Sequence, residues 1–193
     1  AEVITNIRDH VDRDVLVISV LAGITSERLQ LGFGQDQPVI RAMPNTPALV
    51  DAGATALSPG TYATDAHLEK ARAIFEAVGN AVVVPEDHMD AVTGLSGSGP
   101  AYVYMFIEAL TDAGVKQGMS REDASTLARQ TVYGAAKLAI DTDKHPAILR
   151  DEVTTPGGTA IAAVSSLEEH GLRTMLINAV GTATQRSEEL NDE

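Results

Sequence analysis

The spacing of apolar residues changes near residue 86. Before that point short apolar runs alternate with amphipathic stretches, and after it almost every stretch repeats its apolar residues at helical spacing. Alternating strand and helix patterns are typical of a doubly wound, mostly parallel sheet. The sequence therefore predicts an α/β domain over residues 1–86 and an all-helical domain over residues 87–193.

The individual elements follow from runs and breaks in this pattern. The run at 15–21 is rich in β-branched residues and suits a parallel strand covered on both faces. Further strands are expected at 38–43, 55–57 and 81–84, and helices at 2–11, from 25 onward and at 65–78. Later helices are expected to begin at Pro100 and Ser120 and to follow Thr159, and the charged tail after Arg186 is expected to fray.

The expected beginning of a dinucleotide-binding domain is absent from these residues. Nowhere does a strand pattern lead into Gly-x-Gly-x-x-Gly and then into a helix. Gly32-Phe33-Gly34 follows a helical pattern, and Gly97-Ser98-Gly99 runs on into Pro-Ala-Tyr. We interpret neither as a phosphate-binding loop.

Charge and composition narrow the classes of partner. The formal net charge of −13 repels nucleic acid and anionic membrane surfaces, so neither is expected as a partner. The chain has no cysteine, and its five histidines show no ligand spacing, so no metal site is expected. Redox chemistry would need a bound organic cofactor. No membrane-spanning or signal-like stretch is found, so a cytoplasmic location is expected.

Three segments are candidates for ligand binding, and each has a plainer alternative. Met43-Pro44-Asn45-Thr46-Pro47 ends a predicted strand, where open α/β sheets bind ligands, but spacing alone favours a turn stiffened by proline. The segment from Thr93 to Pro100 either lets a flat ligand approach its backbone or links two domains. In Thr155-Pro156-Gly157-Gly158-Thr159, two glycines in a first helical turn would leave N–H groups to attract an anion, and the alternative is a capped helix.

The predicted helices of the second domain have small residues on their faces. Gly134-Ala135-Ala136 lets another helix approach closely, and few large side chains are present to fill a monomeric bundle. A second subunit would supply the missing bulk. Asp143 and His145 fall in a polar loop between helices, where such residues are usually only solvated.

Four segments stand in the order found in one family of reductases. They are Met43 to Pro47, Asp90 to Tyr102 with its Gly-Leu-Ser-Gly-Ser-Gly-Pro-Ala-Tyr run, Gly134-Ala135-Ala136-Lys137, and Thr155 to Thr159. On these segments the chain resembles the pyrroline-5-carboxylate reductases over essentially its whole length. It corresponds to their larger, C-terminal part, without the Gly-rich start of the nucleotide-binding domain.

The resemblance implies a fold, a reaction and an assembly. The fold is a partial Rossmann-type parallel sheet domain followed by an all-helical dimerisation and substrate-binding domain. The reaction is hydride transfer from NADPH or NADH to the C=N carbon of 1-pyrroline-5-carboxylate, which gives L-proline in the final step of proline biosynthesis. The assembly is a homodimer, in many members built into a larger ring of dimers.

The resemblance also implies roles for individual residues. The cofactor would contact Val20, Leu21 and Ala22 beside a strand end, Met43, Pro44 and Asn45 on the nicotinamide side, and Ser96, Ser98 and Pro100 near the reacting ring. The substrate carboxylate would be held by Gly157, Gly158, Thr159 and Ala160. Asp143 also lies at a substrate position, and Asp143 and Thr159 are the candidate catalytic side chains.

Two departures from the family pattern bear on these roles. Ala160 stands where many members have a second hydroxyl residue, so a hydroxyl contact to the substrate would have to come from Thr159. The Gly-rich pyrophosphate loop has no counterpart, so the chain alone is expected to be an incomplete enzyme. The alternatives are a non-catalytic helical dimerisation module and another NADP-linked imine or hydroxyacid reductase.

Overall fold

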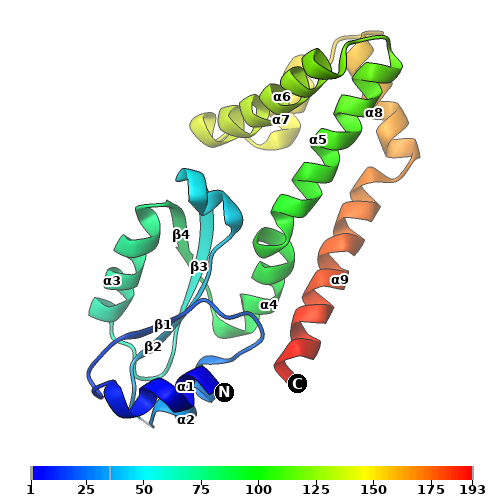
Figure 1. Ribbon diagram of the computed structural model, residues 1–193. Coiled ribbons are helices and arrows are strands. Elements are labelled where there is room, and N and C mark those ends of the chain that lie inside the picture. The colour runs from blue at the N-terminus through cyan, green and yellow to red at the C-terminus, as the bar shows by residue number, and fades with distance from the viewer. Residues whose placement is uncertain (1, 35, 193) are drawn as a thin grey trace. The chain divides into compact units, whose positions relative to one another are not determined.

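The computed structural model describes residues 2–34 and 36–192 and divides into two compact units (Figure 1). The sheet unit comprises Ala1–Pro100 and Asn178–Glu193, and the helical unit comprises Ala101–Ile177. The last helix therefore contributes to both units. The domain bounds expected from the sequence, 1–86 and 87–193, differ from the bounds of these units and stay a prediction.

The sheet unit contains four strands in the order β1-β2-β3-β4. They are β1 (Val17–Ser19), β2 (Val39–Met43), β3 (Gly53–Pro59) and β4 (Gly79–Val83). The pairs β1–β2 and β3–β4 are parallel, which confirms a mostly parallel sheet, but β2 and β3 are antiparallel. The reason is the connection between them, residues 44–52, which is shorter than the dozen or so residues that a parallel crossover needs.

Helices and short helical turns surround this sheet. They are α1 (Glu2–Ile7), η1 (Arg8–His10), α2 (Ser26–Phe33), η2 (Thr46–Val50), α3 (Asp65–Glu76), η3 (Glu86–His88) and α4 (Met89–Val92). The helix expected from residue 25 onward is α2, because the Thr25 hydroxyl accepts from the Arg28 N–H at 3.2 Å and caps its start. The core comprises Ile40, Ala42, Leu57 and Ala71, so apolar residues of β2 and β3 pack with one from α3.

An ion pair between buried Arg41 and half-buried Glu86 joins three elements on the opposite face of β2 from Ile40. The Arg41 guanidinium lies 2.7 Å from Glu86 Oε1, and the Arg41 side chain is only 4% exposed. The same oxygen accepts from the Ser26 N–H at 3.0 Å. Glu86 thereby ties β2, the start of α2 and η3 together, and its negative charge lies favourably at the N-terminus of a helix.

The helical unit is built from long helices, as the apolar spacing predicts (Figure 1). They are α5 (Gly99–Lys116), α6 (Arg121–Thr142), α7 (Pro146–Val153), α8 (Thr159–Glu169) and the first part of α9 (Leu172–Asp192). The Ser120 hydroxyl accepts from the Asp123 N–H at 3.0 Å and starts α6 as expected. The α/β plus all-α fold class predicted from the sequence is confirmed.

The described side chains of the helical unit bury very little of their own apolar surface. Thr111, Ala124 and Ala128 are its buried residues among those that the structure describes. Many large apolar side chains are exposed instead, among them Val103, Tyr104, Met105, Phe106, Leu127, Tyr133, Leu138, Ile140, Ile148, Val153, Leu167, Met175, Leu176 and Ile177. Such a surface is typical of an interface rather than of a free monomer.

The prediction that the tail frays after Arg186 is wrong. Helix α9 continues to Asp192, and Ser187 is 2% exposed. Asp90 accepts hydrogen bonds from Ser187 Oγ at 2.6 Å and from Asn191 Nδ2 at 2.9 Å. These partners stand about a hundred residues earlier in the sequence, so the local composition of the tail gives no sign of them.

Candidate active site

Two candidate cofactor segments lie at the same edge of the sheet. Strands β1 and β2 are parallel neighbours with Ser19 opposite Arg41, so Val20–Ala22 follows the carboxyl end of β1 and Met43–Asn45 begins at the carboxyl end of β2, at the same edge. Val20 is 55% and Leu21 51% exposed. Open α/β sheets bind ligands beyond the carboxyl ends of their strands, and exposed aliphatic side chains suit the face of a flat ring.

Asn45 connects the second of these segments to the glycine-rich run. Its Nδ2 donates to the carbonyl of Ser96 at 3.1 Å, and its Oδ1 accepts from the Ala54 N–H at 2.9 Å. Both ends of the carboxamide are therefore engaged within the protein. Asn45 fixes the turn after β2 against the run at 93–100, which brings together two segments that lie far apart in the sequence.

The run at 93–100 is a packed helical element and not a flexible link. It continues α4 through a π-helical segment, Thr93–Gly97, into α5. Insertions of π-helix within α-helices occur frequently at functional sites. The Ser96 hydroxyl donates to the carbonyl of Val92 at 3.2 Å, so it serves its own helix.

The three glycines of this run differ in what a side chain would meet. At Gly94 a β-carbon would lie 2.5 Å from Thr184 Oγ1 and 2.8 Å from the Val180 carbonyl of α9. At Gly97 it would lie 2.7 Å from Cε of Met43, whereas at Gly99 nothing described lies within 4 Å. Packing within the chain explains the first two glycines. Gly99 leaves open space beside the backbone, as the close approach of a ligand would require.

Gly157 and Gly158 precede helix α8 instead of standing in its first turn, as was expected. Gly158 is the N-cap, and its N–H donates to the Thr155 carbonyl at 2.9 Å. Pro156 followed by Gly157, whose φ is 68°, fits a type II turn. The idea that both glycines offer free N–H groups in the first helical turn is therefore corrected, because the turn uses that of Gly158.

The N–H groups left for an anion belong to the next three residues. The helical bonding of α8 begins when Ala162 donates to the Gly158 carbonyl at 3.3 Å, so Thr159, Ala160 and Ile161 precede it. No side chain among the described residues caps this helix start. The positive end of the helix dipole favours a negative ligand there.

Asp143 ends helix α6 in the left-handed region, with φ of 51°. It is exposed, and its carboxylate has no hydrogen bond or ion pair to any described residue. Its neighbour His145 has a structural role, because its Nδ1 accepts from the Ala147 N–H at 3.2 Å at the start of α7. Asp143 is thus available for a ligand, whereas His145 is engaged.

Lys137 of the Gly-Ala-Ala-Lys segment pairs with Asp141 one turn later in α6, with Nζ 2.5 Å from Oδ2. The hydrogen bond to Asp141, followed by its negative charge, raises the pKa of Lys137. The side chain therefore carries a positive charge at neutral pH on an exposed face of α6.

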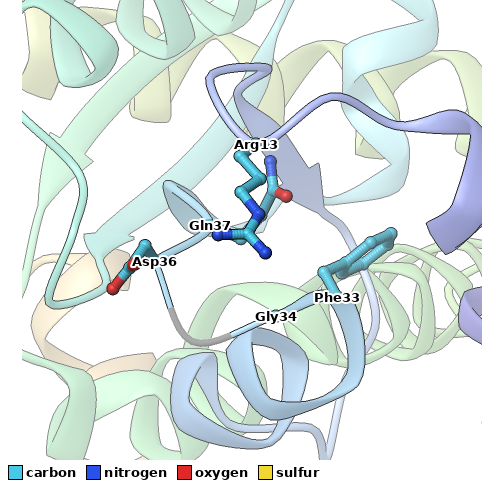
Figure 2. A pocket seen from close by; sticks show the side chains of 5 residues that line it. All are labelled: Arg13, Phe33, Gly34, Asp36 and Gln37. Atoms are coloured by element: carbon cyan, nitrogen blue, oxygen red, sulfur yellow. The ribbon is translucent and has the colours of Figure 1, made fainter.

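A pocket of about 310 Å³ lies away from these segments and was not indicated by the sequence (Figure 2). It is lined by Arg13, Phe33, Gly34, Asp36 and Gln37, and the Arg13 guanidinium points toward Gln37 and Phe33. Gln37 stands just before β2, at the opposite end of that strand from Asn45. The sequence analysis placed Asp90 in a family segment but did not predict its contact with Ser187 and Asn191, which no local signal marks.

Comparisons with known proteins identify the family. Residues 86–190, more than half of the chain, match the family described as pyrroline-5-carboxylate reductase dimerisation. The pyrroline-5-carboxylate reductase of Synechocystis sp. is 56% identical over 175 residues, which cover 91% of this chain and 65% of that protein. The chain belongs to the pyrroline-5-carboxylate reductase family. The resemblance read from the four sequence segments is thereby confirmed.

Solved structures of family members agree with this fold. The Coxiella burnetii pyrroline-5-carboxylate reductase aligns with a TM-score of 0.94 at 38% identity, covering 98% of this chain and 71% of that one. The Plasmodium falciparum pyrroline carboxylate reductase, solved with NADP bound, aligns with a TM-score of 0.90 at 33% identity, covering 98% of this chain and 76% of that one. The chain thus spans between 65% and 76% of the length of these three reductases.

The part of the chain that the structure describes contains neither a set of side chains arranged to bind a metal ion nor a membrane-spanning helix. No group of three or more His, Cys, Asp or Glu side chains within residues 2–34 and 36–192 is arranged to hold a metal ion. In the same residues no helix has both the length and the apolar character needed to cross a bilayer.

Proposed function

We propose that these residues form the larger part of an enzyme that reduces 1-pyrroline-5-carboxylate to L-proline by hydride transfer from NADPH or NADH. Membership of the reductase family supports this, as does the relative solved with NADP bound. The observation that carries the proposal is the contact of Asn45 and Met43 with Ser96 and Gly97. This contact joins the segments Met43–Pro47 and Asp90–Tyr102, both of which are shared with the reductase family, beside the carboxyl ends of β1 and β2.

The sheet unit would bind and orient the dinucleotide, which supplies the hydride when bound. Val20, Leu21 and Ala22 would contact it beside β1, and Met43, Pro44 and Asn45 would approach its nicotinamide side. Ser96, Ser98 and Pro100 would lie near the reacting ring, where Gly99 leaves the backbone uncovered. Hydride transfer depends on such positioning more than on a nucleophile, so the absence of cysteine is no obstacle.

The helical unit would hold the substrate by its carboxylate. Thr159 and Ala160 would donate backbone N–H groups at the start of α8, with Gly157 and Gly158 shaping the turn before them. Local donors matter here because the net charge of −13 opposes any anionic ligand. Residues 155–160 contain no lysine or arginine that could pair with the carboxylate instead.

Two side chains of the helical unit would act on the reacting group. The imine nitrogen must be protonated, or must gain a proton as the hydride arrives. The unpaired carboxylate of Asp143 would favour the iminium ion by its negative charge. The hydroxyl of Thr159 would take the place of the one that Ala160 lacks.

We also infer a homodimer formed through the helical unit. The exposed apolar side chains of α5, α6 and α9 support it, and the matched family model describes dimerisation. Assembly of dimers into a larger ring and a cytoplasmic location both stay predictions.

The proposed cofactor site predicts that NADPH affinity differs between the chain alone and an N-terminally extended chain. The chain alone is expected to bind NADPH weakly, because it contains no helix start after a Gly-x-Gly-x-x-Gly turn to receive the pyrophosphate. An extended chain, in which a family-typical strand–Gly-x-Gly-x-x-Gly–helix segment precedes Ala1, is expected to bind at least ~100-fold more tightly, about 2.7 kcal/mol. Titration by nicotinamide fluorescence measures both. Equal affinities would show that the proposed cofactor site is wrong.

A further inference from the structure

The last turn of α9 packs against the turn that follows β1. Gly23 has φ of 70°, and a β-carbon there would lie 3.0 Å from Cβ of Leu190 and 3.3 Å from its carbonyl group. A few residues later, the Arg28 guanidinium donates to the main-chain carbonyl of Asn191 at 3.1 Å. The end of α9 therefore contacts the chain both within this turn and at the beginning of α2.

A second set of bonds fixes the end of α9 in place. Asp90 in α4 accepts from Ser187 and from Asn191, which lie one turn apart on α9. Ser187 is 2% exposed, so its bond is shielded from water. Hydrogen bonds to a carboxylate are stronger than those between neutral groups. The end of α9 is thus held to α4 while it lies against Gly23.

The turn itself has few other restraints. Val20, Leu21 and Ala22 are exposed, so they contribute little packing. Within this turn Leu21 donates its N–H to Ser19 Oγ at 3.4 Å, a long bond. Segments with few buried contacts open locally at low cost unless something else holds them. The contact with α9 supplies that support.

We propose that the last turn of α9, residues 187–191, is a positioning element that holds the turn Val20–Ala22 in one conformation. Asp90 anchors the element, and Leu190 and Asn191 make its contacts with Gly23 and Arg28. The use of that conformation to receive the dinucleotide rests on the function proposed above. The role of α9 in holding the turn, called the mechanical role below, does not depend on that function and can be measured separately.

Amide hydrogen exchange in the 193-residue chain tests the mechanical role. The double variant Ser187→Ala/Asn191→Ala removes both bonds to Asp90, and exchange in residues 20–25 is expected to rise at least ~10-fold, about 1.4 kcal/mol of local stability. Asn191→Ala alone keeps the buried bond of Ser187 and is expected to give a smaller rise, roughly 3-fold. Glu189→Ala is the matched control, because Glu189 lies in the same turn and, within residues 2–34 and 36–192, its carboxylate accepts hydrogen bonds from Gln185 and Arg186 of its own helix and none from the sheet.

The expected pattern is a rise confined to residues 20–25 and the end of α9, with β2 and β3 unchanged. An unchanged turn in both variants would overturn the proposal, and so would an equal rise throughout the sheet unit. A second arm adds NADPH to the extended chain, where it is expected to slow exchange in residues 20–25 more than it does in an extended chain that carries the double substitution. If NADPH slows nothing while the variants still loosen the turn, the positioning element stands and the proposed cofactor role of the turn fails.

Discussion

Gly158→Val is expected to weaken the binding of L-proline to the extended chain by at least ~10-fold, about 1.4 kcal/mol. A β-carbon at this position would lie 2.3 Å from Thr155 Oγ1 and 3.1 Å from the Thr155 carbonyl. The turn that places the start of α8 would have to move, and the N–H groups of Thr159 and Ala160 would move with it. Each charge-assisted bond from such a group is worth roughly 1.5–3 kcal/mol, so losing one accounts for the effect.

Isothermal titration calorimetry with L-proline measures this change. Gly171→Val is the matched control, because Gly171 also precedes a helix, has φ of 72° and meets nothing described within 4 Å. Gly171→Val strains the turn before α9 through its positive φ, whereas Gly158→Val clashes with Thr155 at an ordinary φ of −77°. The control therefore introduces valine and backbone strain before a helix without touching the start of α8. Proline affinity is expected to persist in this control, and dimer formation and NADPH affinity are expected to persist in both variants. Normal proline binding by a folded Gly158→Val protein would place the carboxylate elsewhere.

The chain is expected to have no stable folded monomer. Its helical unit buries Thr111, Ala124 and Ala128 among the described residues, which is far too little to offset the loss of chain entropy on folding. Side chains such as Met105 and Ile140, 69% and 71% exposed, need a partner surface. Folding and association are therefore expected to occur together, so that thermal stability rises with protein concentration.

Light scattering and circular dichroism over a dilution series measure this coupling. Ile140→Glu places a charge among the exposed apolar residues and is expected to reduce both the dimer fraction and the helix content. Lys116→Glu changes an exposed charged residue at the end of α5 and serves as the control. A helical monomer of normal stability at micromolar concentration would show that the exposed apolar surface has another purpose.

The features that could be predicted from the sequence are local. Thr25 and Ser120 begin their helices because a side-chain oxygen bonds to the backbone N–H three residues later, a rule that needs no tertiary structure. The class of fold follows from apolar spacing in the same way. The antiparallel pairing of β2 and β3 was not predicted, because the expected strands 38–43 and 55–57 left a connection close to the length that a parallel crossover needs.

The features that could not be predicted depend on contacts distant in the sequence. Gly94, Gly97 and Gly99 look alike in the sequence, but their surroundings differ. A side chain at Gly94 would meet α9 and one at Gly97 would meet Met43, whereas nothing described lies within 4 Å of Gly99. The order at the end of α9 depends on Asp90 and not on the composition of the tail. The position of the turn before α8 is an intermediate case, because Pro156-Gly157 is itself the sequence signature of a type II turn.

Proline formation by the extended chain tests the central claim most directly. With 1-pyrroline-5-carboxylate present, NADPH is expected to be oxidised as an equal amount of L-proline appears. Asp143→Asn tolerates the same left-handed backbone while removing the charge that favours the iminium, so it is expected to lower turnover at least ~10-fold with little change in proline affinity. An extended chain that binds NADPH and dimerises but forms no proline would contradict the account and favour a non-catalytic dimerisation module.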